Sequence, residues 1–90
     1  MIRILVVEDE QAISNLIAVN LEAAGYVCDC VSDGMAAADT LDKTVYDLIL
    51  LDVMLPDQSG FDVCRKIREN HNYPVIMLTA RDQEIDKITG

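Results

Sequence analysis

The feature that most restricts the fold of this chain is a set of nearly continuous aliphatic runs. Ile2–Val7 is interrupted only by Arg3, and residues 46–51 and 74–79 form further runs rich in large apolar side chains. A strand with one face in water alternates apolar and polar residues, whereas a strand buried on both faces does not. Unbroken runs are typical of parallel sheets that have helices on both sides. We therefore expect an α/β fold.

Helical patterns lie between these runs. From Glu10 to Ala24, apolar residues recur at steps of three and four, and Gly25 follows as a stop signal. This stripe consists of Ile13, Leu16, Ile17, Leu21 and Ala24. The pattern predicts one amphipathic helix after the first strand.

Three further elements are predicted before the last run. Residues 26–31 are β-branched and aromatic, as in a short strand. Asp33 can cap an alanine-rich helix, and Ser59, with Asp62 three residues later, resembles a capping box before another helix. The inner faces of these two helices are expected to hold Ala37, Ala38, Leu41, Val63, Cys64 and Ile67.

The order of the elements predicts the topology. Four strands alternate with three complete helices, which implies right-handed βαβ units and a parallel sheet. A fourth helix starts at Arg81, and the sequence reaches Gly90 before another strand can follow. We expect residues 1–90 to be the N-terminal, incomplete part of one domain in a longer protein.

Composition and charge exclude several classes of function. The 90 residues are 51% hydrophobic, which indicates a folded globular domain. A net charge of −9 disfavours direct binding to nucleic acid or to an anionic membrane, and favours a basic protein or a divalent cation. No apolar run approaches the ~20 residues that span a bilayer, and no signal-peptide pattern is present. A cytoplasmic location is expected.

The cysteines do not suggest a zinc site. Cys28, Cys30 and Cys64 are an odd number, and the first two share one face of a strand. His71 is the only histidine, and it is expected at the surface near a helix end, without a partner. We interpret the cysteines as small buried thiols in a reducing compartment.

Polar residues stand where the aliphatic runs end. Glu8 and Asp9 follow the first run, Asp52 follows the second, and Thr79 closes the last. Ligands of an open parallel sheet bind beyond the carboxyl ends of its strands, where the strand order reverses. If the first and third strands are neighbours, three carboxylates meet there and need a cation or a proton. Acids at strand ends are also common as solvated turn residues, and the spacing alone leaves that alternative open.

Ligands that offer only oxygen favour a hard ion such as Mg²⁺. We predict that Asp9 and Asp52 bind the ion directly and that Glu8 helps through water or through the local field. A carboxylate at a metal site can also attack phosphorus, because the cation offsets charge on the transferring group. Asp52 is the predicted acceptor, since a rigid buried strand projects it. Thr79 is predicted to hydrogen-bond the phosphoryl oxygens.

Three blocks of the sequence resemble the receiver domain of bacterial two-component response regulators. They are Ile4–Glu10, Asp47–Pro56 with Gly60, and Pro74–Arg81, and together they extend over nearly the whole chain. The end of the last block, residues 78–81, is most similar to the OmpR/PhoB branch, which has winged-helix DNA-binding outputs.

The resemblance implies a flavodoxin-like, doubly wound sheet of strand order 2-1-3-4-5, of which this chain would hold 2-1-3-4. It implies that Asp52 accepts a phosphoryl group from a sensor histidine kinase, with Mg²⁺ held by Asp9, Asp52 and the main-chain carbonyl of Met54. Thr79 is then the hydroxyl that moves toward the phosphoryl group and signals its presence. Such a domain is a signalling switch that catalyses its own phosphoryl transfer, not an enzyme in the usual sense. Its transcriptional output domain would lie beyond residue 90.

The sequence departs from the receiver pattern in one respect. Receivers also use a lysine and an aromatic residue on a fifth strand, and Lys87 does not match that lysine. Without the fifth strand and the last helix, residues 74–79 are expected to form an exposed apolar edge. We expect such a chain either to associate through this edge or to be only marginally stable.

Three other functions fit parts of the pattern. A haloacid-dehalogenase-like phosphatase also has an aspartate after an aliphatic strand, but its second aspartate is replaced here by Met54. A pseudo-receiver has the same fold and signals without phosphate. The presence of Glu8, Asp9, Asp52 and Thr79 in this chain argues against that alternative. A flavodoxin-like nucleotide binder needs a phosphate-cradling loop after the first strand, where this chain is acidic.

Overall fold

A computed structural model describes residues 1–78 of the chain. Its elements are β1 (Arg3–Val7), α1 (Gln11–Ala23), β2 (Val27–Val31), α2 (Gly34–Lys43), β3 (Leu48–Asp52), α3 (Gly60–Asn70) and β4 (Val75–Leu78). Thr79 and the helix predicted from Arg81 lie outside the described residues. Among the described helices, none combines the length and apolar character that a membrane span requires.

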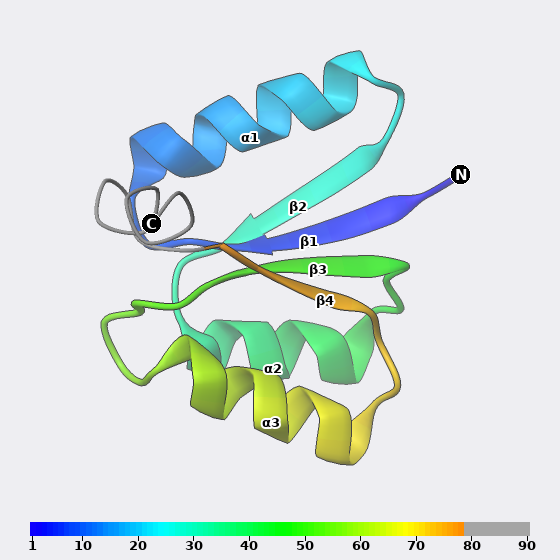
Figure 1. Cartoon of the computed structure of the whole chain (residues 1–90). Coiled ribbons are helices and arrows are strands. Elements are labelled where there is room, and N and C mark those ends of the chain that lie inside the picture. The colour runs from blue at the N-terminus through cyan, green and yellow to red at the C-terminus, as the bar shows by residue number, and fades with distance from the viewer. Residues whose placement is uncertain (79–90) are drawn as a thin grey trace, which may run out of the picture.

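The four strands form one parallel sheet in the order β2-β1-β3-β4. The register pairs Val6 with Leu50 and Leu51 with Met77, so the carboxyl ends of the strands meet at one edge. Figure 1 shows α1 on one face of the sheet and α2 with α3 on the other. The predicted flavodoxin-like α/β fold, doubly wound with strand order 2-1-3-4, is confirmed.

The two faces of the sheet are packed differently. Residues of β1 and β3 alternate in direction, and Leu5, Val7, Ile49 and Leu51 are fully buried in a cluster with apolar residues of α2 and α3. Those helix residues are Ala37, Leu41, Val63 and Ile67. On the opposite face, Ile4, Leu48, Leu50 and Ile76 border a shallow hollow beside α1. β3 is therefore packed more tightly on the side of α2 and α3 than on the side of α1.

The helix ends follow the predicted signals in part. Gly25 has φ of +96°, in the left-handed region that favours glycine, directly after the end of α1. Asp33 caps α2 by accepting a hydrogen bond from the Ala36 N–H at 2.7 Å. Ser59 begins α3 but accepts from the Phe61 N–H, and Asp62 pairs with Arg65 of the same helix. The reciprocal capping box is therefore replaced by a simpler cap.

Several single-residue expectations are wrong. Ala24 and Ala38, which were expected on inner helix faces, are exposed. Leu16 is 64% exposed, because the inward face of α1 is centred near Ser14, Ile17 and Leu21, and Leu16 lies on the opposite side of the helix. Cys30 is exposed, whereas Cys28 and Cys64 are half-buried, and all three thiols are free. His71 lies at the end of α3, as expected, but it is half-buried, with its Nε2 3.8 Å from Asp42 Oδ1 and its ring against Tyr73.

A polar cluster joins three strands at the amino edge of the sheet. Tyr46 is buried just before β3, and its hydroxyl donates to Asp29 Oδ2 at 2.7 Å. Arg3 Nε lies 3.3 Å from the same oxygen. Burial, followed by the hydrogen bond to Asp29, raises the pKa of Tyr46 to about 12. This cluster ties the start of β1 and the middle of β2 to the entry of β3.

Candidate metal and phosphoacceptor site

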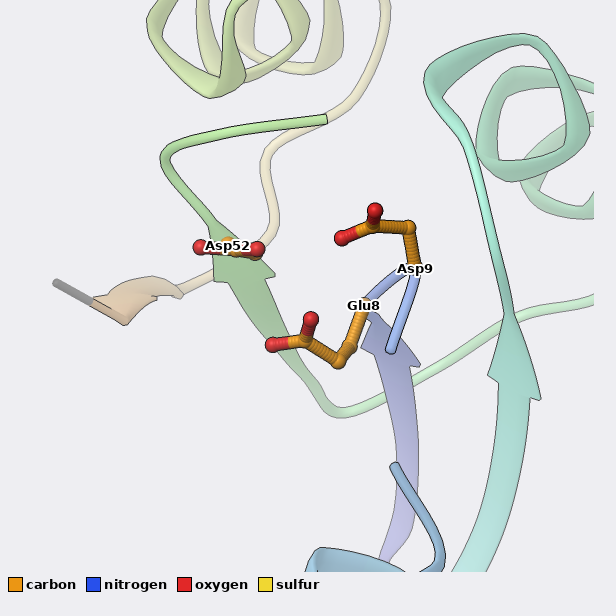
Figure 2. Close-up of side chains that lie close together, drawn as sticks. All are labelled: Glu8, Asp9 and Asp52. Atoms are coloured by element: carbon orange, nitrogen blue, oxygen red, sulfur yellow. The ribbon is translucent and has the colours of Figure 1, made fainter. Parts of the chain in front are cut away.

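The candidate site lies where the strand order reverses. Parallel pairing of β1 with β3 places the residues that end β3 beside those that follow β1. One carboxylate oxygen each from Glu8, Asp9 and Asp52 lies within 4.8 Å of the others. Figure 2 shows the three side chains gathered beyond the ends of these two strands. The structure thus brings together the three acids that the sequence placed at strand ends.

Asp52 is the most enclosed of the three acids. Its side chain is 1% exposed, and its Oδ1 accepts a hydrogen bond from the Met54 N–H at 3.3 Å. No described residue donates to Oδ2, which is itself buried. A buried polar atom without a partner costs free energy, on the order of 1–3 kcal/mol, so it calls for a ligand or a function. Strand β3, whose Ile49 and Leu51 are fully buried, holds this oxygen in place.

Glu8 and Asp9 differ in environment although they are adjacent. Glu8 is buried and accepts a hydrogen bond from the Glu10 N–H at 3.1 Å, whereas Asp9 is exposed. Burial raises the pKa of Glu8 above its ordinary value. The charges of Asp52 and Asp9 raise it further, and so does the hydrogen bond that a protonated Glu8 makes to the Asp52 side chain. The hydrogen bond from Glu10 opposes this rise. The cluster therefore concentrates negative charge that is poorly solvated.

The loop after Asp52 is closed at its base. The Gly60 N–H donates to the Val53 carbonyl at 2.7 Å, and Met54 forms an isolated antiparallel bridge with Ser59. A Cβ at position 60 would overlap the Asp52 carbonyl and approach the Val53 Cα closely. Gly60 is thus required, because only a residue without a Cβ permits this close approach of the backbone.

Met54 and Thr79 are the two remaining residues of the predicted site. The main chain of Met54 is bound to the site through its N–H, while its side chain is 61% exposed. The metal-binding role of its carbonyl stays a prediction. Thr79 lies outside the described residues, and its role also stays a prediction.

Asp57 is a residue of this loop to which the sequence reading gave no role. Its carboxylate accepts hydrogen bonds from the Gly34 and Met35 N–H groups at the start of α2. The bond from Gly34 is the main reason that the pKa of Asp57 is lowered. The partners are more than twenty positions apart in sequence, so only the tertiary fold reveals the contact. From the sequence alone, an aspartate next to Pro56 is indistinguishable from an ordinary turn residue.

Comparison with known proteins defines the class. The response regulator receiver domain family matches residues 4–90, and the chain belongs to this family. Receiver domains are signalling modules whose function is linked to phosphorylation, and they are not enzymes in the usual sense. The predicted receiver class is therefore confirmed.

Solved structures agree with this assignment. The Francisella response regulator 1452 receiver domain has a TM-score of 0.86 and 31% identity, with 99% of this chain and 74% of that chain covered. TrrA of Thermotoga maritima, in complex with Mg²⁺–BeF, has a TM-score of 0.86 and 34% identity, covering 99% and 78%. The complex of histidine kinase ThkA with TrrA gives 0.86 and 37%, covering 91% and 72%.

Proposed function

We propose that Asp52 accepts a phosphoryl group from a sensor histidine kinase and that Asp9, Asp52 and the Met54 main-chain carbonyl hold Mg²⁺ for this reaction. Glu8 assists through water or through its field. The observation that carries the proposal is the buried, unpartnered Oδ2 of Asp52, with two other carboxylates within 4.8 Å. A solvated turn would leave such an oxygen exposed to water.

The donor set fits a hard divalent cation. All three side chains offer only oxygen, and like charges in a partly buried cluster need a compensating positive charge. When bound, Mg²⁺ would offset the charge of Asp52 and of the incoming phosphoryl group. The similar protein TrrA has been solved in complex with Mg²⁺–BeF, which supports the same chemistry here.

The residues of the chain then supply orientation. One oxygen of Asp52 forms a bond to phosphorus while the bond from phosphorus to the donor breaks, and the leaving atom takes the electron pair. The Met54 N–H holds the carboxylate in one orientation through Oδ1. Fixed geometry of this kind lowers the entropy cost of reaching the reactive arrangement. Thr79 would hydrogen-bond the phosphoryl oxygens and signal their presence.

Partners follow from the same proposal. The ThkA–TrrA complex supports a histidine kinase as the phosphoryl donor. The Leu78–Arg81 pattern supports an OmpR/PhoB-type protein whose separate output domain binds DNA and regulates transcription. The acidic surface of the receiver itself would contact neither nucleic acid nor membrane, in keeping with a cytoplasmic switch. Association of copies through β4 is a further part of this proposal.

The proposal is tested by incubating the full-length protein with Mg²⁺ and a small acyl phosphate and measuring its intact mass. One phosphoryl group per chain is expected for the wild type and none for Asp52→Asn. Asp9→Asn should slow the reaction roughly tenfold or more, because it removes a predicted metal ligand. Asp39→Asn is the matched control, since Asp39 is exposed and pairs only weakly, with Lys43 at 4.0 Å.

Two results would contradict the proposal. Modification that persists in Asp52→Asn would place the acceptor elsewhere. A wild-type chain that remains unmodified, with either the acyl phosphate or a phosphorylated kinase, would indicate a pseudo-receiver instead.

A further inference from the structure

The loop between β3 and α3 is fixed at its tip as well as at its base. At the base, Val53 and Gly60 are hydrogen-bonded, and Met54 bridges to Ser59. At the tip, Asp57 reaches away from the site to a different element. The loop that carries Met54 is therefore held between β3 and a second anchor.

That anchor is the N-terminus of α2. Asp57 Oδ1 accepts from the Gly34 N–H and Oδ2 from the Met35 N–H, both at 3.0 Å. The first N–H groups of a helix have no partner within the helix, so an external carboxylate satisfies them well. The next N–H, that of Ala36, is capped by Asp33. Two acids thus complete one helix end, and only Asp57 comes from the loop.

Packing strengthens the connection. Lys66 Nζ of α3 donates to Gln58 Oε1 at 3.0 Å, and the amide nitrogen of Gln58 lies 3.4 Å from Asp57 Oδ2. A Cβ on Gly34 would come too close to the side chains of Gln58 and Val63. The loop tip, α2 and α3 are therefore in direct contact, and α2 cannot shift away without breaking the Asp57 bonds.

We propose that Asp57 is a positioning residue that ties the loop carrying Met54 to α2, so that occupation of the Asp52 site and the order of the α2 N-terminus depend on each other. This inference rests on the proposed function, because it assigns a coupling to the same site. A metal ligand supplied by a loop needs that loop to be fixed. Coupling of this kind is reciprocal, so the cation must also stabilise the start of α2.

The test compares Asp57→Ala with Asp33→Ala in the full-length protein. Both variants remove one cap of α2, but only Asp57→Ala releases the loop. Mg²⁺ affinity is measured by calorimetric titration, and amide hydrogen exchange is measured at Gly34 and Met35. Asp57→Ala should weaken Mg²⁺ binding roughly fivefold to tenfold, at the lower end of the usual range for coupling between sites, while Asp33→Ala should change it by less than about twofold.

Two further readouts separate positioning from general stability. Asp57→Asn keeps one carbonyl acceptor, so its Mg²⁺ affinity should fall between those of the wild type and Asp57→Ala. Mg²⁺ should slow exchange of the Gly34 and Met35 amides in the wild type, and this effect should be lost in both Asp57 variants. Urea unfolding identifies any variant that fails to fold.

Equal loss of Mg²⁺ affinity in Asp57→Ala and Asp33→Ala would overturn the inference, because α2 stability alone would then explain the effect. Wild-type affinity in Asp57→Ala would overturn it as well, and the proposed function would stand. Absence of Mg²⁺ binding by the wild type would instead overturn both proposals.

Discussion

Tyr46 illustrates how one residue can set a pH limit on stability. Its phenol is buried and donates to Asp29, and its pKa is raised from 10.0 to about 12. Below pH 10 the folded and unfolded chains both hold the phenolic proton. Between pH 10 and 12 the unfolded chain releases the proton and the folded chain does not, so stability is lost as pH rises through this range.

Tyr46→Phe is therefore expected to have two effects. At neutral pH it should lower the free energy of unfolding by about 1 kcal/mol, because the hydrogen bond to Asp29 is lost. Between pH 10 and 12 its stability should decline less steeply than that of the wild type. Urea unfolding at stepwise pH measures both effects. Tyr26→Phe, at a more exposed tyrosine, is the control at neutral pH, with an expected change within about 0.5 kcal/mol. Parallel declines of the wild type and Tyr46→Phe would contradict the argument.

At the scale of elements, the connection from β3 to α3 depends on a glycine for a different reason than the connection after α1 does. Gly25 needs its left-handed φ, but a Cβ there would contact nothing within 4 Å. Gly60 needs space, because a Cβ would overlap the end of β3 itself. The first cost is local, whereas the second displaces the backbone next to Asp52.

Gly60→Ala is expected to destabilise the protein by about 2–3 kcal/mol, since backbone atoms cannot yield as a flexible side chain can. Gly25→Ala, the control for backbone strain alone, should cost about 1–2 kcal/mol. Urea unfolding gives both values. Near-neutral stability of Gly60→Ala would mean that the closed base of the loop adapts more easily than the structure indicates.

Elements were predictable to the extent that their signals are local. The unbroken run before Asp52 predicts β3 and its burial, because only a strand covered on both faces uses such a sequence. The position of Leu16 was not predictable, because it lies at the margin of the apolar stripe and periodicity does not show which part of that stripe faces the sheet. The convergence of Glu8 with Asp52 required only strand order, whereas the contact of Asp57 with α2 required the loop conformation.

For the whole molecule, the carboxylate cluster is a source of instability at the carboxyl ends of the two central strands, β1 and β3. The chain already carries a net charge of −9, and Asp52 adds a buried oxygen with no donor among the described residues. The core around Leu51 supplies the stability that holds this oxygen in place. Under the proposed function, the cluster opposes folding when it is empty and supports folding when a cation fills it.

This balance predicts a cation-dependent order of stabilities. Without divalent cations, Asp52→Asn should be more stable than the wild type by about 1–3 kcal/mol, because it removes a buried charge and its amide can donate toward Glu8. Saturating Mg²⁺ should stabilise the wild type by about 2.7 kcal/mol at a hundred times Kd, and Asp52→Asn by much less. Thermal unfolding of the full-length protein in chelator and in Mg²⁺ measures both.

Asp39→Asn provides the charge-matched control for this comparison. It changes the net charge by the same amount, from −9 to −8, but it removes an exposed carboxylate on α2. If it stabilises the chain as much as Asp52→Asn does, the gain reflects net charge and not the cluster. If the wild type is more stable than Asp52→Asn in chelator, the Asp52 carboxylate has a compensating partner. The claim that the empty cluster destabilises the fold is then wrong.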